Sequence, residues 1–432
     1  MRRLPVRLLG RRSCPGVHKE RGAVAIIVAL SMVVVVGFAG LALDLGKLYV
    51  AKSELQNSVD ACALAAAREL TGANTNQLAL AEAAGITAGM HHDVLFQSET
   101  VSLTADGSVT FSQAFDGAYQ PKSAISPAEA LLMQYARCRV ARAGIANWFI
   151  QVLNLVPGIS VGSQAVAATA VATRTPSQIT SCAIPAGLCS SAVTPAPPIG
   201  TWLQSVIGPG ESGGGTGNLT GNFMWVDFTP PGGGASELSE NLTGPGVCNL
   251  PAIGAEVGEA GVISSLAVGW NSRFGIYHGS VSQSASIPDY AGYAYTDAAG
   301  SWPVKFNAFA DFRSRRGTHA AYQGDAATGL KTSGTIADSG YLQANGGDRR
   351  LATVAVIDCG GFTKGSTAPV QSWACVLMLH PINNSQGGSG TGSTRMYLEY
   401  LGRSDVPGNP CATSGVPAGP DNGGPLVPVL VR

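Results

Sequence analysis

The stretch that decides the fold runs from residue 22 to residue 70 and reads GAVAIIVALSMVVVVGFAGLALDLGKLYVAKSELQNSVDACALAAAREL. Its first 22 residues, Gly22 to Leu43, include no charged side chain. At about 1.5 Å of rise per residue, a helix of that length crosses a hydrocarbon core of about 30 Å. A carboxylate at the centre of such a span costs about 2.5 to 3.5 kcal/mol. The stretch therefore predicts a transmembrane helix over residues 22–43, with Asp44 at the water boundary.

The charges on the two sides of the span predict its orientation. Only Lys47 and Lys52 follow the span closely, whereas seven basic residues precede it: Arg2, Arg3, Arg7, Arg11, Arg12, Lys19 and Arg21. Basic flanks stay in the cytoplasm, so we expect residues 1–21 there and the rest of the chain on the opposite side. The alternative is a cleaved signal peptide with a small-residue site at residues 40–42. The apolar run exceeds the usual 7 to 15 residues of such signals, which favours a retained anchor.

The helix is expected to continue beyond the membrane. No proline interrupts residues 21–70, and the apolar residues keep a spacing of mostly three or four: Leu41, Leu45, Leu48, Leu55, Val59, Cys62, Ala66 and Leu70. This pattern predicts one rod of about 50 residues, with Asp44 as a hinge exposed to solvent. The Ala-rich stripe either packs within the chain or packs against equivalent helices in a filament or assembly platform. Every amphipathic helix must bury its apolar face, which favours packing within the chain.

Composition limits the function classes and suggests the domain count. The chain has 432 residues, of which 45% are hydrophobic and only 12% charged, with 56 glycines and 25 prolines. Such a chain can form two domains beyond its anchor, and we expect them at residues 44–180 and 221–432, separated by a Cys loop and Pro/Gly-rich linker at residues 181–220. The net charge is zero and no basic block follows the span, which excludes a nucleic-acid partner.

The expected fold class is α+β, with a long amino-terminal helix followed by mixed helix and antiparallel-sheet domains. The first domain should contain these elements: a helix at 76–90, a hairpin of 100–104 with 108–112, a strand at 135–140, a short helix at 146–155 and one long strand or a strand pair at 159–173. The second should contain strands at 223–228, 351–357, 373–379 and 396–401. We expect the last three strands in one antiparallel sheet, since turn-rich Gly and Ser segments separate them.

Eight of the nine cysteines follow the span, and an even number in an oxidising compartment predicts disulfides. Eight cysteines allow 105 complete pairings, so connectivity stays open in general. Pro185 and Gly187 should bend the loop between Cys182 and Cys189, which favours that pair. A bridge between Cys62 and Cys138 is expected if the rod packs on the sheet. Three cysteines should tie the second sheet to its loops, with open partners: Cys359, Cys375 and Cys411.

A search for chemistry finds no catalytic, cofactor-binding or metal-binding residue. His91, His92 and Asp93 are adjacent at a helix end, where neighbouring side chains point about 100° apart and histidine is ordinary. Residues 313–316, Arg-Ser-Arg-Arg, predict a solvated basic turn, and the alternative is contact with an acidic partner or polymer. No nucleophile motif, zinc spacing or phosphate loop occurs. We therefore expect no enzymatic activity and no cofactor.

The order of motifs in the amino-terminal stretch resembles a known family. RGAVA at 21–25, LDLGKLY at 43–49 and ELQNSVDACALAAAREL at 54–70 are similar to the first segment of TadG-like proteins of the Flp (tight adherence, Tad) pilus-assembly system. The resemblance implies a single-pass protein of the bacterial inner membrane with a periplasmic body. Its implied partners are the lipid bilayer and other pilus-assembly proteins or pseudopilins, in a pathway of cell adhesion. Ile27 stands where pilins of that system carry Glu, so prepilin processing is not expected.

Two functions follow from these observations. The first is a membrane-anchored structural component of pilus assembly that acts through protein–protein contacts. The second is a cell-envelope binding or hydrolytic protein in which residues 190–432 carry the activity on a Tad-type anchor. Surface pili and adhesion in a strain that lacks the protein discriminate between them.

Overall fold

The computed structural model describes residues 21–155, 158, 160–207, 220–230, 234–259, 266–298, 300–362, 365–383, 394–419 and 422–431. The chain forms two compact units, of which unit 1 comprises residues 1–172 with 430–432 and unit 2 comprises residues 173–429. Helices and antiparallel sheets occur in both units, which confirms the α+β expectation. The basic segment predicted over residues 1–21 lies outside the described residues apart from Arg21.

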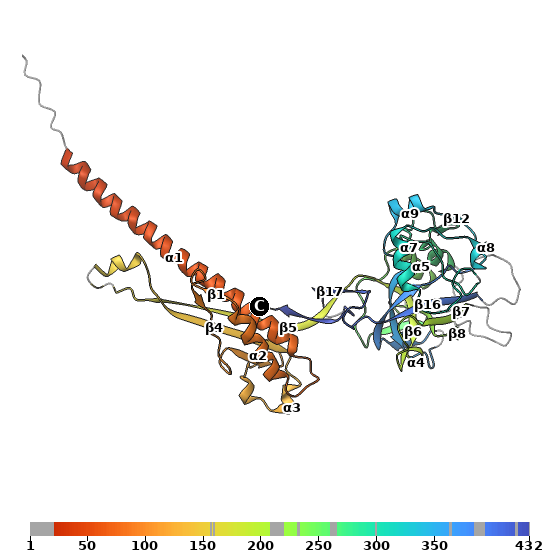
Figure 1. Cartoon of the computed structure of the whole chain (residues 1–432), viewed down its shortest axis with the longest axis horizontal. Helices are drawn as coiled ribbons and strands as arrows, with labels where there is room; N and C mark the ends of the chain where they lie inside the picture. Colours follow the sequence, from red (N-terminus) through yellow and green to blue (C-terminus); the bar gives the residue numbers. More distant parts are fainter. Residues whose placement is uncertain are drawn as a thin grey trace, which may run out of the picture. The chain divides into compact units, whose positions relative to one another are not determined.

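Unit 1 is built on one long helix. Helix α1 (Arg21–Glu69) has 49 residues and is continuous, as the sequence predicts (Figure 1). The other elements of unit 1 are α2 (Gln77–Met90), β1 (Asp93–Val94), β2 (Glu99–Thr100), β3 (Val109–Ser112), η1 (Lys122–Ala124), α3 (Pro127–Ala130), β4 (Tyr135–Ile145), η2 (Ile150–Leu155) and β5 (Gln164–Ile179), which continues into unit 2.

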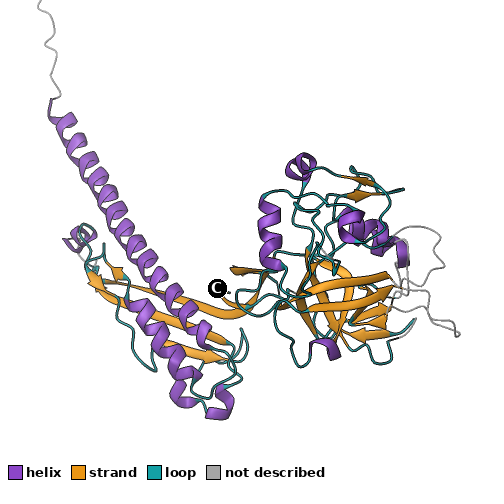
Figure 2. Ribbon diagram, turned by 45° about the vertical axis from the view of Figure 1, so that its right-hand side comes forward, coloured by secondary structure: helices purple, strands orange, loops and turns teal. Residues whose placement is uncertain are grey.

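Helices α1 and α2 pack against the antiparallel sheet β3–β4–β5 (Figure 2). The buried stripe of α1 comprises Ala51, Leu55, Val59, Cys62, Ala63, Ala66 and Ala67, and Leu70 directly after the helix is buried with them. A Cβ added at Gly85 of α2 would lie 3.1 Å from the carbonyl oxygen of Cys62, so small residues permit the close approach of the two helices. The stripe therefore packs within the chain, as favoured from the sequence, although Leu41 and Leu45 of the predicted stripe are exposed.

Three expectations for unit 1 need correction. The predicted hairpin is wrong, because β3 pairs with β4, whereas the short β2 pairs with β1. The turn predicted between residues 104 and 108 is present, since the Ser108 N–H donates to the Thr104 carbonyl at 3.0 Å. Alternating residues reveal a strand and a local turn but do not select the partner strand. The helix predicted at 146–155 is the shorter 3₁₀ helix η2, and β5 begins later and ends later than predicted.

Unit 2 contains a nine-stranded sheet. Its order is β14 (Thr367–Pro369), β10 (Glu256–Glu259), β9 (Phe223–Asp227), β6 (Ala183–Cys189), β13 (Leu351–Ile357), β15 (Ser372–Met378), β16 (Thr394–Arg403), β7 (Trp202–Ile207) and β8 (Thr220–Gly221). Neighbouring strands are antiparallel except for the parallel pair β6–β13. Strands β13, β15 and β16 are adjacent, which confirms the predicted three-stranded arrangement.

Both faces of this sheet are covered. Along β15, Ala374, Val376 and Met378 enter one buried cluster, whereas Cys375 and Leu377 enter another. The remaining elements of unit 2 are α4 (Ser190–Val193), α5 (Gly234–Thr243), α6 (Leu266–Ser272), β11 (Ile276–Tyr277), α7 (Phe309–Gly317), α8 (Asp325–Thr328), β12 (Thr335–Ile336), α9 (Ser339–Asn345), β17 (Ala412–Pro417) and β18 (Leu426–Leu430). A sheet buried on both faces explains why its central strands consist of near-continuous apolar residues.

The expected linker at 181–220 is wrong for its described residues, because they supply β6, α4 and β7 to unit 2. Every residue of β6 is buried. The register with β13 shifts between Ala183 and Gly187, so Pro185, which has no N–H to donate, lies in a bulge. A Cβ on Gly187 would lie 2.7 Å from a methyl group of Val226. Pro185 and Gly187 therefore lie within a central strand, where one occupies a bulge and the other permits close packing, and they do not bend a loop.

Four disulfides join the eight cysteines. Cys62 on α1 is bonded to Cys138 on β4, as the sequence suggests, with the Cα atoms 6.1 Å apart. The other pairs are Cys182–Cys248, Cys189–Cys359 and Cys375–Cys411. The favoured Cys182–Cys189 pair is wrong because these residues lie at opposite ends of β6, and an extended strand of that length separates them by about 20 Å, whereas a disulfide spans at most about 7 Å.

The Cys62–Cys138 bridge should contribute to the stability of unit 1. It closes a loop with a sequence separation of 76 residues. Replacing both cysteines with Ala should therefore lower the free energy of unfolding of unit 1 by about 4 kcal/mol. Pulse proteolysis in urea of the full chain in detergent measures this change. A Cys375→Ala, Cys411→Ala chain is the control, since it should leave the transition of unit 1 unchanged; an unaltered midpoint in the first variant would contradict the expectation.

Candidate membrane anchor and its docking site

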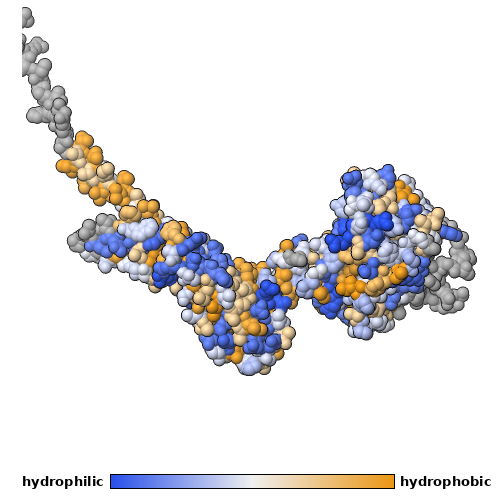
Figure 3. Space-filling view, viewed as in Figure 1, coloured by the Kyte–Doolittle hydropathy of each residue, from blue (hydrophilic) through white to orange (hydrophobic). Residues whose placement is uncertain are grey.

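The amino-terminal half of α1 has the properties of a membrane span. Among the described residues, α1 is the helix long and apolar enough to cross a membrane. Its large apolar side chains between Val24 and Leu43 are exposed, up to 71% for Val33. Figure 3 shows this half as a hydrophobic surface that extends beyond the body of unit 1. The helix is therefore compatible with a single-pass anchor over the predicted residues 22–43.

Asp44 is the residue that connects this span to the sheet. It is only 4% exposed, so the predicted hinge in solvent is wrong. Its carboxylate accepts hydrogen bonds from the backbone N–H groups of Trp148 at 2.6 Å, Phe149 at 2.9 Å and Ile150 at 2.6 Å. These amides precede and open η2, where no helical acceptor exists for them. Asp44 therefore caps a helix that lies more than 100 residues away in the sequence.

The surroundings of Asp44 favour its charged form. Burial opposes ionisation, but the three backbone hydrogen bonds and the nearby Lys47 ammonium together hold the pKa of the carboxyl below its ordinary value. Lys47 also donates from Nζ to the carbonyl oxygen of Ala146 at 2.9 Å and lies 4.5 Å from the ring centroid of Trp148. The Asp44 carboxylate and the Lys47 ammonium, one turn apart on α1, therefore both hold the loop that follows β4.

Gly40 lets the loop approach the helix. A Cβ at Gly40 would lie 2.5 Å from the Cβ of Phe149, whereas a Cβ at Gly37 would meet nothing within 4 Å. Gly40, Asp44 and Lys47 have the spacing i, i+4 and i+7, which places them on one face of α1. We call residues 146–151 the hairpin tip, since they follow β4 on the way to β5. The Asn147 side chain fixes this tip by donating to the carbonyl of Gly162 at 2.9 Å.

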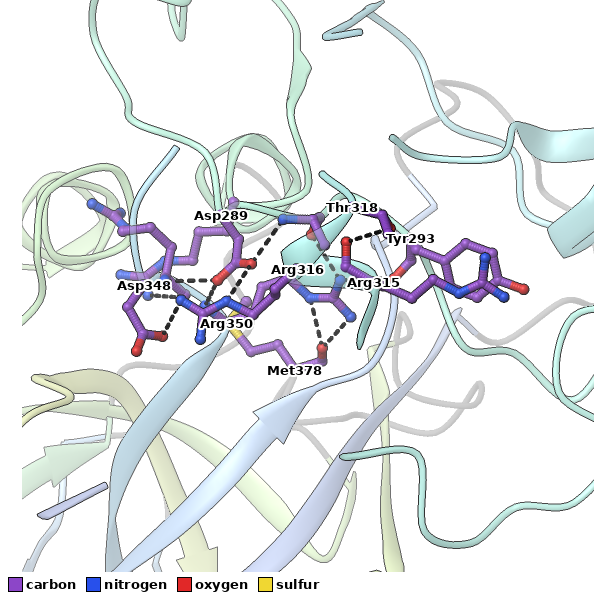
Figure 4. A network of polar contacts seen from close by, with 11 residues as sticks. Asp289, Tyr293, Arg315, Arg316, Thr318, Asp348, Arg350 and Met378 are labelled. Carbon is purple, nitrogen blue, oxygen red and sulfur yellow. Dashed lines mark hydrogen bonds and ion pairs between the residues drawn. The ribbon is translucent and has the colours of Figure 1, made fainter. Parts of the chain in front are cut away.

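A second polar cluster lies inside unit 2 (Figure 4). Asp289 is fully buried and accepts from the backbone N–H groups of Ala291, Arg349 and Arg350 at 3.0, 2.8 and 2.9 Å. Arg316 lies 3.5 Å from Asp289 and 3.4 Å from Asp348. Residues 313–316 belong to helix α7, so the predicted turn is wrong. Arg313 and Ser314 are exposed, whereas Arg316 pairs with the buried Asp289 and the exposed Asp348, which the pattern of charges did not reveal.

The buried guanidinium groups of this cluster satisfy backbone carbonyls. Arg350 donates to the carbonyls of Met378, Ala291 and Tyr293, and Arg273 donates to those of Leu242 and Arg349. Burial lowers the pKa of Arg350 to about 10, so its guanidinium stays protonated at neutral pH. The carbonyls of Ala291, Tyr293 and Arg349 lie in loops, and those of Met378 and Leu242 lie at the ends of β15 and α5. Such carbonyls need a hydrogen-bond partner when they are buried, and the guanidinium groups supply it. We therefore assign the cluster to the fold of unit 2.

His91 and His92 follow the carboxyl end of α2. His91 caps the carboxyl end of α2, where its backbone N–H donates to the carbonyls of Ala88 and Gly89. Within the described part of the chain, no three His, Cys, Asp or Glu side chains gather where they could hold a metal ion.

Residues 22–69 match the family described as "Putative Flp pilus-assembly TadE/G-like". We call this matching stretch the Tad segment. The match confirms the resemblance predicted from the sequence, and it ends where α1 ends. The Tad segment includes the span, Gly40, Asp44, Lys47 and the stripe buried in unit 1. No curated protein and no solved structure matches the chain.

Gly40→Ala should loosen the hairpin tip. The new Cβ would collide with the Cβ of Phe149, and such overpacking costs about 1 to 3 kcal/mol. Hydrogen exchange at the amides of Trp148, Phe149 and Ile150 should therefore accelerate about tenfold or more. Gly37→Ala is the matched control and should leave these rates unchanged. Equal exchange rates in the two variants would show that Phe149 does not pack closely against Gly40.

Protection of the same amides should depend on pH through Asp44. Because the folded pKa is lowered, the stabilisation is complete above the unfolded value of about 3.9 and is lost as the pH falls through the folded value. Asp44→Asn should remove this dependence and accelerate exchange about a hundredfold at pH 7, given about 1.5 to 3 kcal/mol per charged hydrogen bond. Asp60→Asn on the same helix is the control. Wild-type protection in Asp44→Asn would refute the cap.

Proposed function

We propose that the protein is a membrane-anchored structural component of Flp/Tad-type pilus assembly that acts through protein–protein contacts and not as an enzyme. The Tad segment is the single observation that carries this proposal. The continuity of α1 supports it, since one helix serves both as the anchor and as a core element of unit 1. A disulfide and the Asp44 cap hold that helix to the sheet.

The contact surface on the rod follows from what unit 1 already buries. The Ala-rich stripe of α1 is used within the chain, so it is not the surface that a partner meets. The exposed positions of the periplasmic half of α1 include Ser53, Asn57 and Arg68. We infer that another pilus-assembly protein or a pseudopilin contacts this outer face of the helix.

The same proposal includes the cellular location. The protein would span the bacterial inner membrane once, with residues 1–21 in the cytoplasm and both units in the periplasm. Four disulfides suit an oxidising compartment. The seven basic residues before the span suit a cytoplasmic amino terminus.

Removing the gene should abolish surface pili and adhesion, and both should return with the wild-type chain. A photo-crosslinking amino acid placed at Ser53 or Asn57 should then trap a pilus-assembly protein in cells. The control is the same amino acid at Leu55, which is 1% exposed and should give no adduct. Normal piliation without the protein would contradict the proposal and favour the envelope-binding or hydrolytic alternative, in which unit 2 carries the activity.

A further inference from the structure

We propose that the hairpin tip is a second membrane-contacting element, in which Trp148 and Phe149 enter the lipid–water interface beside α1. The inference rests on the proposed function, since it requires the Tad segment to be inserted in a bilayer. The lipid is the partner, through its acyl chains and the glycerol region. The contact would attach unit 1 to the membrane at two places.

The position of the tip along α1 is the first argument. Phe149 lies against Gly40, which precedes Asp44 and belongs to the predicted span. Four residues of helix correspond to about 6 Å of depth. If Asp44 marks the edge of the hydrocarbon core, Phe149 therefore reaches below that edge.

The surface next to the tip is the second argument. Phe149 and Ile150 form one wall of a groove of about 790 Å³, and the other wall consists of span residues such as Met32, Val33 and Gly37. Val33 is 71% exposed and Met32 66%, so the rest of unit 1 leaves that wall uncovered. An inserted span has lipid at this wall. Because the groove is continuous with the lipid-facing surface, acyl chains are the occupant that the geometry favours.

The chemistry of the tip fits the interface. Trp148 is 56% exposed and Phe149 45%, and aromatic side chains of this kind gather where a bilayer meets water. Tyr49 on α1 is 70% exposed and adds a third aromatic group near the boundary. Lys47 packs its ammonium over the Trp148 ring, and a lysine stem can lie along apolar surface while its charge reaches water.

The backbone N–H groups of residues 148–150 have hydrogen-bond acceptors within the protein, as a medium with little water requires. An unsatisfied N–H in lipid costs several kcal/mol. Asp44 accepts the N–H groups of residues 148, 149 and 150, so these amides require no water. On the other side, the Trp148 ring stacks on Phe96 at a centroid distance of 6.4 Å and an interplanar angle of 11°. The exposed aromatic side chain is therefore held in place.

Quenching of tryptophan fluorescence by brominated lipid tests this inference on the full chain. Trp148 is the one tryptophan of unit 1, and the other five lie in unit 2. The wild-type chain, in bilayers of brominated phosphatidylethanolamine and phosphatidylglycerol, should lose more emission than Trp148→Phe does. The difference between the two chains is the emission of Trp148, and acrylamide in the water should quench that component poorly.

Each outcome decides between distinct claims. A second chain, Val33→Trp in the Trp148→Phe background, reports whether the anchor itself is inserted. Quenching of the indole introduced at position 33 without quenching of Trp148 would overturn the inference and leave the anchor intact. Absence of quenching at both positions would overturn the inserted anchor together with the inference. Quenching of both would support a tip that lies in the membrane.

Discussion

The structure of unit 1 depends on one buried carboxylate. Asp44 lies within α1, at the point where the helix would pass from lipid to water. It accepts hydrogen bonds from three backbone N–H groups of the loop that follows β4. Gly40 on one side and Lys47 on the other give the loop room and a second attachment. Because these three groups share one face of α1, the orientation of the span is fixed relative to the sheet of the same unit.

A comparable device occurs in unit 2. Glu399 of β16 is fully buried and accepts from the backbone N–H groups of Ala308 and Phe309 at 2.6 and 3.0 Å, at the start of α7. Burial raises the pKa of the Glu399 carboxyl, whereas the pKa of Asp44 is lowered. Glu399 also has three donors, since the Trp202 indole N–H donates to it at 3.1 Å. The difference is the nearby Lys47 charge, which Asp44 has and Glu399 lacks. Each unit thus uses an acid from a distant element to satisfy the amides of a short helix.

Features with a strong period or composition were predictable from the sequence. The span, the continuous helix and the three neighbouring strands of unit 2 follow from such patterns, and the family match at residues 22–69 agrees with them. The role of Asp44 was not predictable, because its partners lie more than 100 residues away and local periodicity shows only the end of an apolar run. The loop predicted from Pro185 and Gly187 was wrong for the same reason. The bulge depends on pairing with β13, which is distant in the sequence.

The central claim is that Asp44 holds the loop after β4 against the Tad segment. Solid-state NMR on the full chain in bilayers tests it most directly, with ¹³C in the aspartate carboxyl groups and ¹⁵N in the tryptophan amides. The account predicts strong dipolar dephasing between Asp44 and the Trp148 amide, since that nitrogen lies 2.6 Å from a carboxylate oxygen, and loss of that dephasing in Asp44→Asn. A wild-type chain without this dephasing would contradict the account.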